Sequence, residues 1–388
     1  YTDYLTTIEN ISIDGNATDV NSFSDFLKRM RENLNSKMVG LSFSNSKFIN
    51  DHLNILQQYV FTRKLQSLEF QNSFFDKTVF QFFITNFLPI LSQNPDFTSL
   101  SLEDIEYLNF DELYRSLPPQ VKSLSVVNCN VSIDQAFNIL TSDSKSGNNG
   151  LSVLNLSYNT FNMRHRMMIN EMSFTIPSFL TVIILDHITF PYGVMMPFLN
   201  SLFRTINNDT DISLVQMISS EDDFGKLDEM FERLVRDFYS KKNKMKFIRS
   251  LKWDSNPIST NFICFLELQT SLLELSISGC YCPDDSDGFD DFCEYLSNNR
   301  SLTKLICKRF NQISLESLTI KLIEAVGKSK INYLDISNSR GGILCYEVLK
   351  SLITFLFASS INVKSHIGAN PKCLSISRNE SFREFLDN

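Results

Sequence analysis

One segment in the first half of the chain reads Leu151-Ser152-Val153-Leu154-Asn155-Leu156-Ser157-Tyr158-Asn159-Thr160-Phe161. Its apolar residues Leu151, Leu154 and Leu156 are separated by two residues and then by one. In an extended strand, Leu154 and Leu156 point to one face and the residues between them to the other. The side chain of Asn159 can hydrogen-bond the backbone of the turn that leaves the strand. The segment predicts a short strand with one buried face, followed by a tight turn.

The same apolar spacing recurs along the whole chain. Its copies begin at Ile8, Met38, Leu65, Phe97, Val121, Leu151, Leu180, Ile212, Ile248, Leu272, Leu302 and Ile331, with Ile212 the weakest. The mean interval of about 29 residues is that of the longer leucine-rich repeats. A degenerate further copy is expected between Ile361 and Ile376. Turn asparagines equivalent to Asn159 are predicted at Asn128, Asn256 and Asn338.

A helical pattern follows most of these strands, as in the spacing of Leu53, Leu56 and Val60. One strand and one helix of this length cannot bury their apolar faces alone, so neighbouring repeats must stack. The predicted fold class is therefore α/β. We expect a leucine-rich repeat solenoid (horseshoe) of about 12–13 repeats, with a parallel sheet on the concave face and helices on the convex face. The many phenylalanines are interpreted as core residues.

The repeat boundaries predict three parts. Residues 1–36 form an N-terminal cap or first repeat, 37–360 the solenoid, and 361–388 a C-terminal cap. The long interval after Ile212 predicts an extended repeat at about 205–247, with an elongated helix or loop. The acidic segment from Cys280 to Asp291 lacks the acid spacing and closing glutamate of a calcium-binding loop, so it is interpreted as a solvated loop.

Composition excludes several classes of protein. The 388 residues are 43% hydrophobic and carry a net charge of −8, which fits a globular chain without a nucleic-acid-binding stripe. No apolar stretch reaches the roughly 18–20 residues of a bilayer-spanning helix, so no integral membrane segment is expected. The eight scattered cysteines are interpreted as buried thiols of a reducing compartment, which favours a cytoplasmic protein.

Catalytic signatures are missing from the sequence. It has no phosphate-binding glycine loop, no nucleophile elbow and no zinc-protease motif. The four histidines, His52, His165, His187 and His366, lie in different repeats and are interpreted as packing or surface residues. The cysteines lack the paired spacing of a zinc site. We therefore expect no catalytic residue, no metal site, no cofactor and no enzymatic activity.

Protein binding is the remaining expectation, and the repeat geometry places it on the concave face. Most outward strand positions there are small serines. The exception is an apolar group, Val127, Val153, Val182 and Ile184, which we expect to be contiguous over three neighbouring strands. An exposed group of this kind is a candidate partner site. The alternative is that an adjoining loop or tail covers it.

The repeats resemble most specifically the repeat domain of the CARMIL family, the linkers of capping protein, Arp complex and myosin. The motif at Leu151 leads through a long helix to Pro177-Ser178-Phe179-Leu180, as in that family. The interval between Ile212 and Ile248 resembles the extended repeat of the family. A third similar segment is Leu296-Ser297-Asn298-Asn299-Arg300-Ser301-Leu302, followed by Arg309-Phe310-Asn311. The similarity runs from about Met38 to Leu356.

The resemblance implies a cytoplasmic scaffold at the cytoskeleton or membrane cortex that regulates actin filament capping and actin assembly. Its implied partners are the actin-capping machinery or myosin. In that family the capping-protein motif and the dimerisation region lie beyond the repeats, so no contact residue is carried over, and a homodimer would form through regions outside this chain. One alternative is a generic repeat module within a larger cytoskeletal or axonemal assembly, without a capping role. An enzyme inhibitor is a third interpretation.

Overall fold

The computed structural model describes residues 9–15, 20–32, 39–62, 65–141, 150–162, 176–206, 209–217, 221–240, 247–282, 285–310, 316–336, 362–366 and 373–376. The chain divides into two units, Tyr1–Tyr192 and Gly193–Asn388. The boundary between the units falls inside the predicted solenoid. The predicted parts 1–36, 37–360 and 361–388 stay a prediction.

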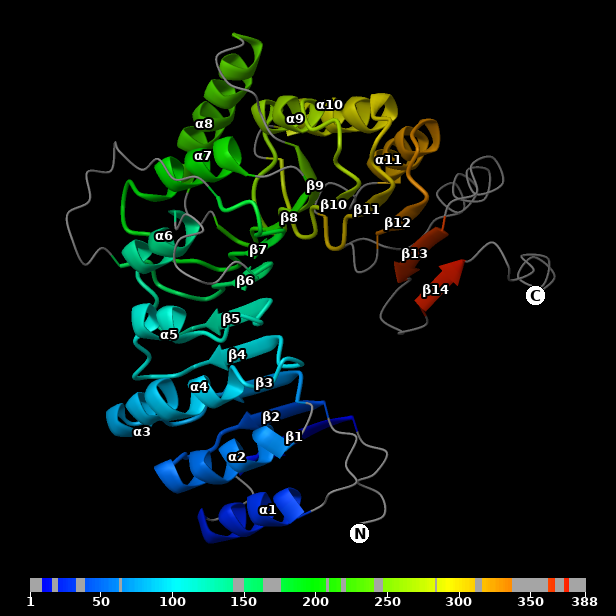
Figure 1. The fold of residues 1–388 in the computed structure, drawn as a ribbon. Helices are drawn as coiled ribbons and strands as arrows, with labels where there is room; N and C mark the ends of the chain where they lie inside the picture. Colours follow the sequence, from blue (N-terminus) through cyan, green and yellow to red (C-terminus); the bar gives the residue numbers. More distant parts are fainter. Residues whose placement is uncertain are drawn as a thin grey trace, which may run out of the picture. The chain divides into compact units, whose positions relative to one another are not determined.

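The first unit contains a parallel sheet whose strands follow one another in chain order (Figure 1). The strands are β1 (Asn10–Asp14), β2 (Gly40–Ser44), β3 (Ser67–Gln71), β4 (Ser99–Glu103), β5 (Ser123–Val127), β6 (Val153–Asn155) and β7 (Val182–Ile184). Each motif residue pairs with its equivalent in the next repeat. Leu124, for example, pairs with Leu154, and Leu154 pairs with Ile183. This register confirms the repeat predicted from the sequence.

The helices of the first unit lie on one side of its sheet (Figure 1). They are α1 (Val20–Glu32), α2 (Asn50–Thr62), α3 (Lys77–Phe82), the π-helical turn η3 (Phe83–Phe87), α4 (Leu88–Leu91), α5 (Phe110–Ser116) and α6 (Ile133–Thr141). Helix α3 begins after Asp76, whose carboxylate accepts a hydrogen bond of 2.8 Å from the backbone N–H of Val79. This side-chain cap satisfies one of the amides left free at a helix start.

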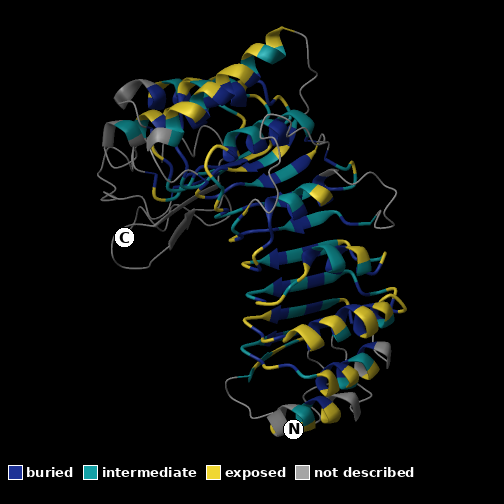
Figure 2. Cartoon of the chain, turned by 90° about the vertical axis from the view of Figure 1, so that its left-hand side faces the viewer, coloured by how far each residue is buried: buried dark blue, intermediate teal, exposed yellow. Residues whose placement is uncertain are grey.

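The core of the first unit lies between the sheet and its helices. Buried and half-exposed residues alternate along β3, β4 and β5, as expected of strands with one covered face (Figure 2). Phenylalanine rings stack from one repeat to the next, for example Phe43 on Phe70 at 5.7 Å and Phe48 on Phe75 at 5.2 Å between ring centroids. These contacts confirm the interpretation of phenylalanine as a core residue.

The second unit repeats the same arrangement. Its strands are β8 (Thr210–Ser213), β9 (Ile248–Lys252), β10 (Glu274–Ser276), β11 (Lys304–Ile306), β12 (Tyr333–Asp335), β13 (Asn362–His366) and β14 (Cys373–Ile376). Its helices are α7 (Met195–Thr205), α8 (Glu221–Tyr239), α9 (Thr260–Glu267), α10 (Asp285–Asn298) and α11 (Glu316–Lys328). Strands β8 to β13 are parallel, so the expected degenerate copy does form a strand, and β14 is antiparallel to β13. Among the described residues, no helix is both long and apolar enough to cross a membrane.

The predicted register of the weakest repeat is wrong. The sequence pattern placed Ile212 at the first position of its repeat, but Ile212 pairs with Leu251, which occupies the fourth position. A register shift between Thr210 and Asp211 accompanies this pairing. The error arose because the true motif starts with polar residues. Leu214 occupies the sixth position of the true motif and is fully buried. The apolar residues Val215 and Met217, which follow Leu214, have the motif spacing from Ile212 and gave the wrong register.

Two irregular repeats turn out to be helical. Helix α8, with 19 residues, lies in the interval expected to hold the extended repeat at about 205–247. Helix α10 begins at Asp285, so the prediction of a solvated loop up to Asp291 is wrong from that residue onward. The physical reason is a periodic apolar face in the same segment. Phe289, Phe292 and Leu296 recur at helical spacing and are fully buried.

The turn that leaves the strand follows one pattern in most of the described repeats. Its first residue has a positive φ, the left-handed conformation, at Asn45, Asn72, Asp104, Asn128, Tyr158, His187, Gln216, Ser255, Gly279 and Arg309. The next residue points inward and is buried, as Asn159 and Asn256 show. Asn128 therefore differs from the prediction. It occupies the left-handed position, which asparagine tolerates well, and Cys129 takes the inward position. Asn338 lies outside the described residues.

Inward asparagines tie the turn to the neighbouring repeat. The amide nitrogen of Asn159 donates to the carbonyls of Val126 at 2.7 Å and Leu156 at 2.8 Å. Its amide oxygen accepts from the backbone N–H groups of Cys129 at 2.9 Å and Val131 at 3.0 Å. The prediction that Asn159 bonds the backbone of the turn is confirmed. The side chain also bridges two repeats.

Candidate functional site

The open face of the first unit, meaning the sheet face away from its helices, carries the predicted apolar group. Val153 on β6 pairs with Val182 on β7, and Ile184 follows two residues later on the same strand face. All three side chains are half-buried, so part of each is accessible. These residues, Val153, Val182 and Ile184, form a continuous surface that we call the apolar patch.

Val127 does not join the apolar patch. Its register neighbour on β4 is Glu103, and on the other side its strand continues alongside Ser157. Asn155 lies between Val127 and the patch. Its amide nitrogen donates to Ser125 Oγ at 3.1 Å, and its amide oxygen accepts from Ser157 Oγ at 2.6 Å. The expectation of four contiguous residues therefore reduces to three, with Val127 separated from them by a polar network.

An acidic group lies on the same open face, two to four strands from the apolar patch. It consists of Glu69 on β3, Glu103 at the end of β4 and Asp104 directly after it. Strands β1 to β7 contain no lysine, arginine or histidine. Burial raises the pKa of the Glu103 carboxyl, and the neighbouring charges of Asp104 and Glu69 raise it further, while a hydrogen bond from Gln71 opposes the shift. The ionised form of Glu103 is therefore disfavoured at this place.

Glu103→Gln should make the protein slightly more stable at neutral pH. The pKa of Glu103 is raised in the folded state, so its favourable contribution is complete below the unfolded-state pKa and is lost as the pH rises through the folded-state pKa. The variant should unfold about 1–2 °C above the wild type at pH 7, and this difference should vanish near pH 3.5. Thermal melts at both pH values measure it. Glu106→Gln, at an exposed neighbouring position, is the control and should match the wild type. A wild-type advantage at pH 7 would contradict the unfavourable placement of Glu103.

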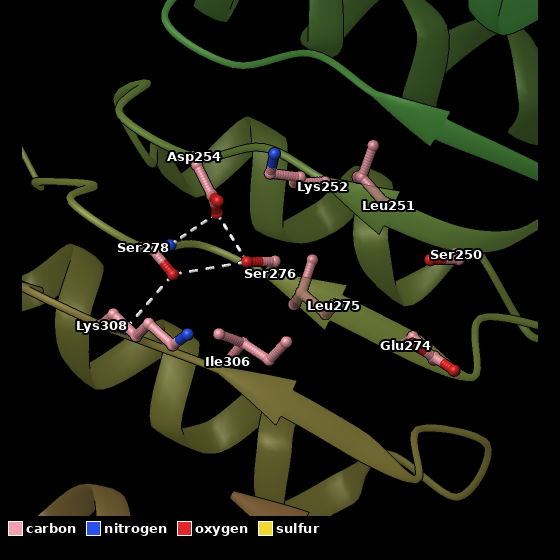
Figure 3. Close-up of a pocket in the computed structure, with 10 residues that line it drawn as sticks. All are labelled: Ser250, Leu251, Lys252, Asp254, Glu274, Leu275, Ser276, Ser278, Ile306 and Lys308. Carbon is pink, nitrogen blue, oxygen red and sulfur yellow. Dashed lines mark hydrogen bonds between the residues drawn. The ribbon is translucent and has the colours of Figure 1, made fainter. Parts of the chain in front are cut away.

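The open face of the second unit is hollowed over β9, β10 and β11 (Figure 3). The hollow has a volume of about 330 Å³, and its lining includes Lys252, Asp254, Glu274, Ile306 and Lys308 together with small serines. The Asp254 carboxylate accepts hydrogen bonds from Ser276 Oγ at 2.6 Å and from the Ser278 backbone N–H at 2.7 Å. Ser278 Oγ accepts in turn from the backbone N–H of Lys308 at 3.3 Å. These bonds hold Asp254 across two strands.

Three pairs of opposite charges lie across strands on this second open face. Arg249 pairs with Asp211, Lys304 with Glu274 at 2.8 Å, and Lys308 with Asp335 at 3.4 Å. The Asp335 side chain is only 2% exposed, so its pairing matters for stability more than a surface ion pair would. The sequence shows the same alternating charges at outward positions, but the pairing depends on the register between strands. The two open faces therefore differ: the strands of the first carry acids and no cation, whereas three acids of the second each pair with a cation.

Histidines and cysteines show the packing roles expected of them where they are described. His52 is fully buried, and its Nε2 lies 2.9 Å from Ser24 Oγ. His187 stacks on Tyr158 with ring centroids 4.5 Å apart. His165 and the side chain of His366 lie outside the described residues.

Among the six described cysteines, all but Cys264 are buried, and burial raises the pKa of Cys129, Cys282 and Cys293 to about 12. Such thiols stay protonated and are poor nucleophiles and poor metal ligands. Cys345 and the side chain of Cys373 lie outside the described residues. In the described part of the chain, no three His, Cys, Asp or Glu residues are grouped so that they could hold a metal ion.

Comparison with known proteins finds similarity to solved structures. No protein-family model matches the chain, and no curated protein matches its sequence. Similar solved structures include the leucine-rich repeat domain of APL1B, with 12% identity and a TM-score of 0.28 over 73% of this chain and 60% of that domain. A leucine-rich repeat protein of Leptospira interrogans is similar over 92% of this chain and 90% of its own, with 11% identity and a TM-score of 0.35. The repeating strand and helix units of the chain itself, with their parallel register, identify an α/β leucine-rich repeat fold.

Proposed function

We propose that the chain is a non-catalytic scaffold that binds partner proteins on the open face of its first unit. The observation that carries the proposal is the apolar patch of Val153, Val182 and Ile184, whose side chains are only half-buried on a sheet face that the helices leave uncovered. Repeat proteins use such extended sheet faces to bind other proteins. An accessible apolar surface rimmed by polar residues is typical of protein interfaces.

Within this proposal, the sequence resemblance to CARMIL repeats supports a role in actin assembly. The supporting features are the order of the similar segments between about Met38 and Leu356 and the long helix α8 in the interval that resembles the extended repeat. The scaffold would then act in the cytoplasm, at the cytoskeleton or cortex, on the actin-capping machinery or myosin. A repeat module of a larger cytoskeletal or axonemal assembly is the competing outcome of the test.

Val153→Asp and Ile184→Asp should each abolish partner association without unfolding the protein. A buried carboxylate at the contact would have to lose its water, while the free protein keeps that residue partly solvated. The assay uses the full chain as bait in a lysate of its own organism, with mass spectrometry of the retained proteins. Capping protein, actin or myosin should be recovered with the wild type and with Gln81→Glu, an exposed helical control on α3 that adds the same charge. Thermal midpoints should stay within a few degrees of the wild type.

The contrary outcomes are distinct. A large loss of stability in both aspartate variants would show that the patch residues belong to the core, which contradicts the proposed site. Recovery of a different defined complex would contradict the role in capping and support the larger-assembly interpretation. If nothing is retained above background, the scaffold proposal itself is contradicted.

A further inference from the structure

We infer that the open face of the first unit binds an extended, basic segment of its protein partner, with lysine or arginine side chains against Glu69 and Glu103 and an apolar side chain on the apolar patch. This inference rests on the proposed scaffold function and assigns a chemistry to the partner. It follows from three observations: the unbalanced charge of this face, the position of the carboxylates on it, and their separation from the patch.

The charged residues within the strands of this face are all acidic, and Lys122 lies directly before β5. Strands β1 to β7 carry acids and no basic residue, whereas Asp211, Glu274 and Asp335 of the second unit each have a cationic partner. In the described part of the chain, no ion pair involves Glu69, Glu103 or Asp104. Neutral amides donate to two of them: Asn128 to Asp104 and Gln71 to Glu103. A cationic ligand is the complement that this face lacks.

The carboxylates stand where a ligand can reach them. Glu69 pairs in register with Ser101, and Gln71 pairs with Glu103, so the two acids lie on adjacent strands, one diagonal step apart. The side chains around them on the same face are mostly short serines, which leave room for a backbone to approach. Burial and the nearby charges of Asp104 and Glu69 raise the pKa of the Glu103 carboxyl, and a bound cation would oppose this shift.

The separation from the patch sets the length of the segment. Neighbouring strands lie about 4.8 Å apart, so β4 and β7 are about 14 Å apart across the face. An extended chain advances about 3.4 Å per residue, so about four residues cover this distance. A partner segment would therefore place its lysine or arginine about four residues from its apolar anchor. The same acids repel phosphate, which disfavours nucleic acid and anionic lipid as occupants.

Selection from a displayed library of random twelve-residue peptides on the full chain tests the inference. The enriched peptides should carry lysine or arginine three to five residues from an aliphatic or aromatic residue. Synthetic copies of them should bind at 50 mM NaCl and weaken at least tenfold at 300 mM NaCl, measured by fluorescence anisotropy. The double variant Glu69→Gln with Glu103→Gln should weaken binding at least tenfold. Asp51→Asn with Glu112→Gln, which removes the same charge from the helical side, should stay within twofold.

Three results would overturn the inference. They are enrichment of acidic peptides, basic peptides that bind the double variant as well as the wild type, and no enrichment at all. Failure of the underlying scaffold proposal is recognised separately. If the lysate partner still depends on Val153 and Ile184 while basic peptides fail, the scaffold stands and only the basic segment is refuted. If the lysate partner is also absent, both the scaffold proposal and the inference of a basic segment are contradicted.

Discussion

Replacing Phe231 with alanine should lower the free energy of unfolding by about 3–5 kcal/mol. Phe231 lies on α8 and is fully buried. Its ring centroid is 5.1 Å from those of Phe262 and Phe265 and 5.8 Å from that of Trp253. Truncation removes the ring contacts and leaves a cavity that rigid aromatic neighbours cannot fill, so the cost includes both the lost burial and the cavity.

Urea denaturation followed by tryptophan fluorescence measures this loss. Trp253 is the only tryptophan of the chain and contacts Phe231 directly, so its emission reports on this part of the core. Tyr239→Ala is the matched control, because Tyr239 lies on the same helix but is 70% exposed, and it should change stability by no more than about 0.5 kcal/mol. A cost below about 1 kcal/mol for Phe231→Ala would contradict the packing of α8 against the repeat core.

The repeating strands could be predicted because burial imposes its own period on the sequence. Leu154 and Leu156 face the core of their repeat. The parallel register places Leu124 and Ile183, the equivalents of Leu154, beside it on the neighbouring strands. The prediction failed at β8, where the buried positions are filled by Thr210, Ile212 and Leu214. A buried threonine at the start of the motif is invisible to a search for apolar residues, so the apolar residues that follow gave a false register.

Helix α10 shows a different limit of the sequence analysis. Its many acidic residues suggested a calcium-binding loop and led to the prediction of a solvated loop. The deciding signal was the spacing of Phe289, Phe292 and Leu296, whose burial supplies more free energy than a few exposed charges remove. The acidic residues of the segment do not prevent a helix, and the helical spacing of its buried apolar residues predicts one.

The candidate site could be predicted only in part. Val153 and Val182 occupy the same position of consecutive repeats, so their contact follows from the repeat alone. Val127 occupies the seventh position of its repeat, whereas Val153 and Val182 occupy the third, and Val127 pairs with Glu103. This difference in repeat position could have predicted that Val127 is separate from the patch. Unbalanced charge was also present in the sequence. Whether an acid has a cationic partner depends on the register between neighbouring strands, which the sequence alone does not give.

Asn159→Leu should destabilise the protein by at least about 3 kcal/mol. Asn159 is 1% exposed, and its side chain bonds two backbone carbonyls and two backbone N–H groups that have no access to water. Leucine has a similar size and fills the space, so the expected loss measures the unsatisfied backbone groups, each of which costs about 1–3 kcal/mol when buried. Chemical denaturation followed by circular dichroism gives the value.

Asn159→Cys should recover part of this loss, because cysteine already occupies the same inward position in two other repeats. Cys129 Sγ accepts from the backbone N–H of Ile105 at 3.4 Å, and Cys280 Sγ donates to the carbonyl of Trp253 at 3.1 Å. A thiol restores fewer and weaker bonds than an amide, so the cysteine variant should fall between leucine and the wild type. Equal stability of the leucine and cysteine variants would mean that the volume of the side chain, and not its hydrogen bonding, fixes the turn between repeats.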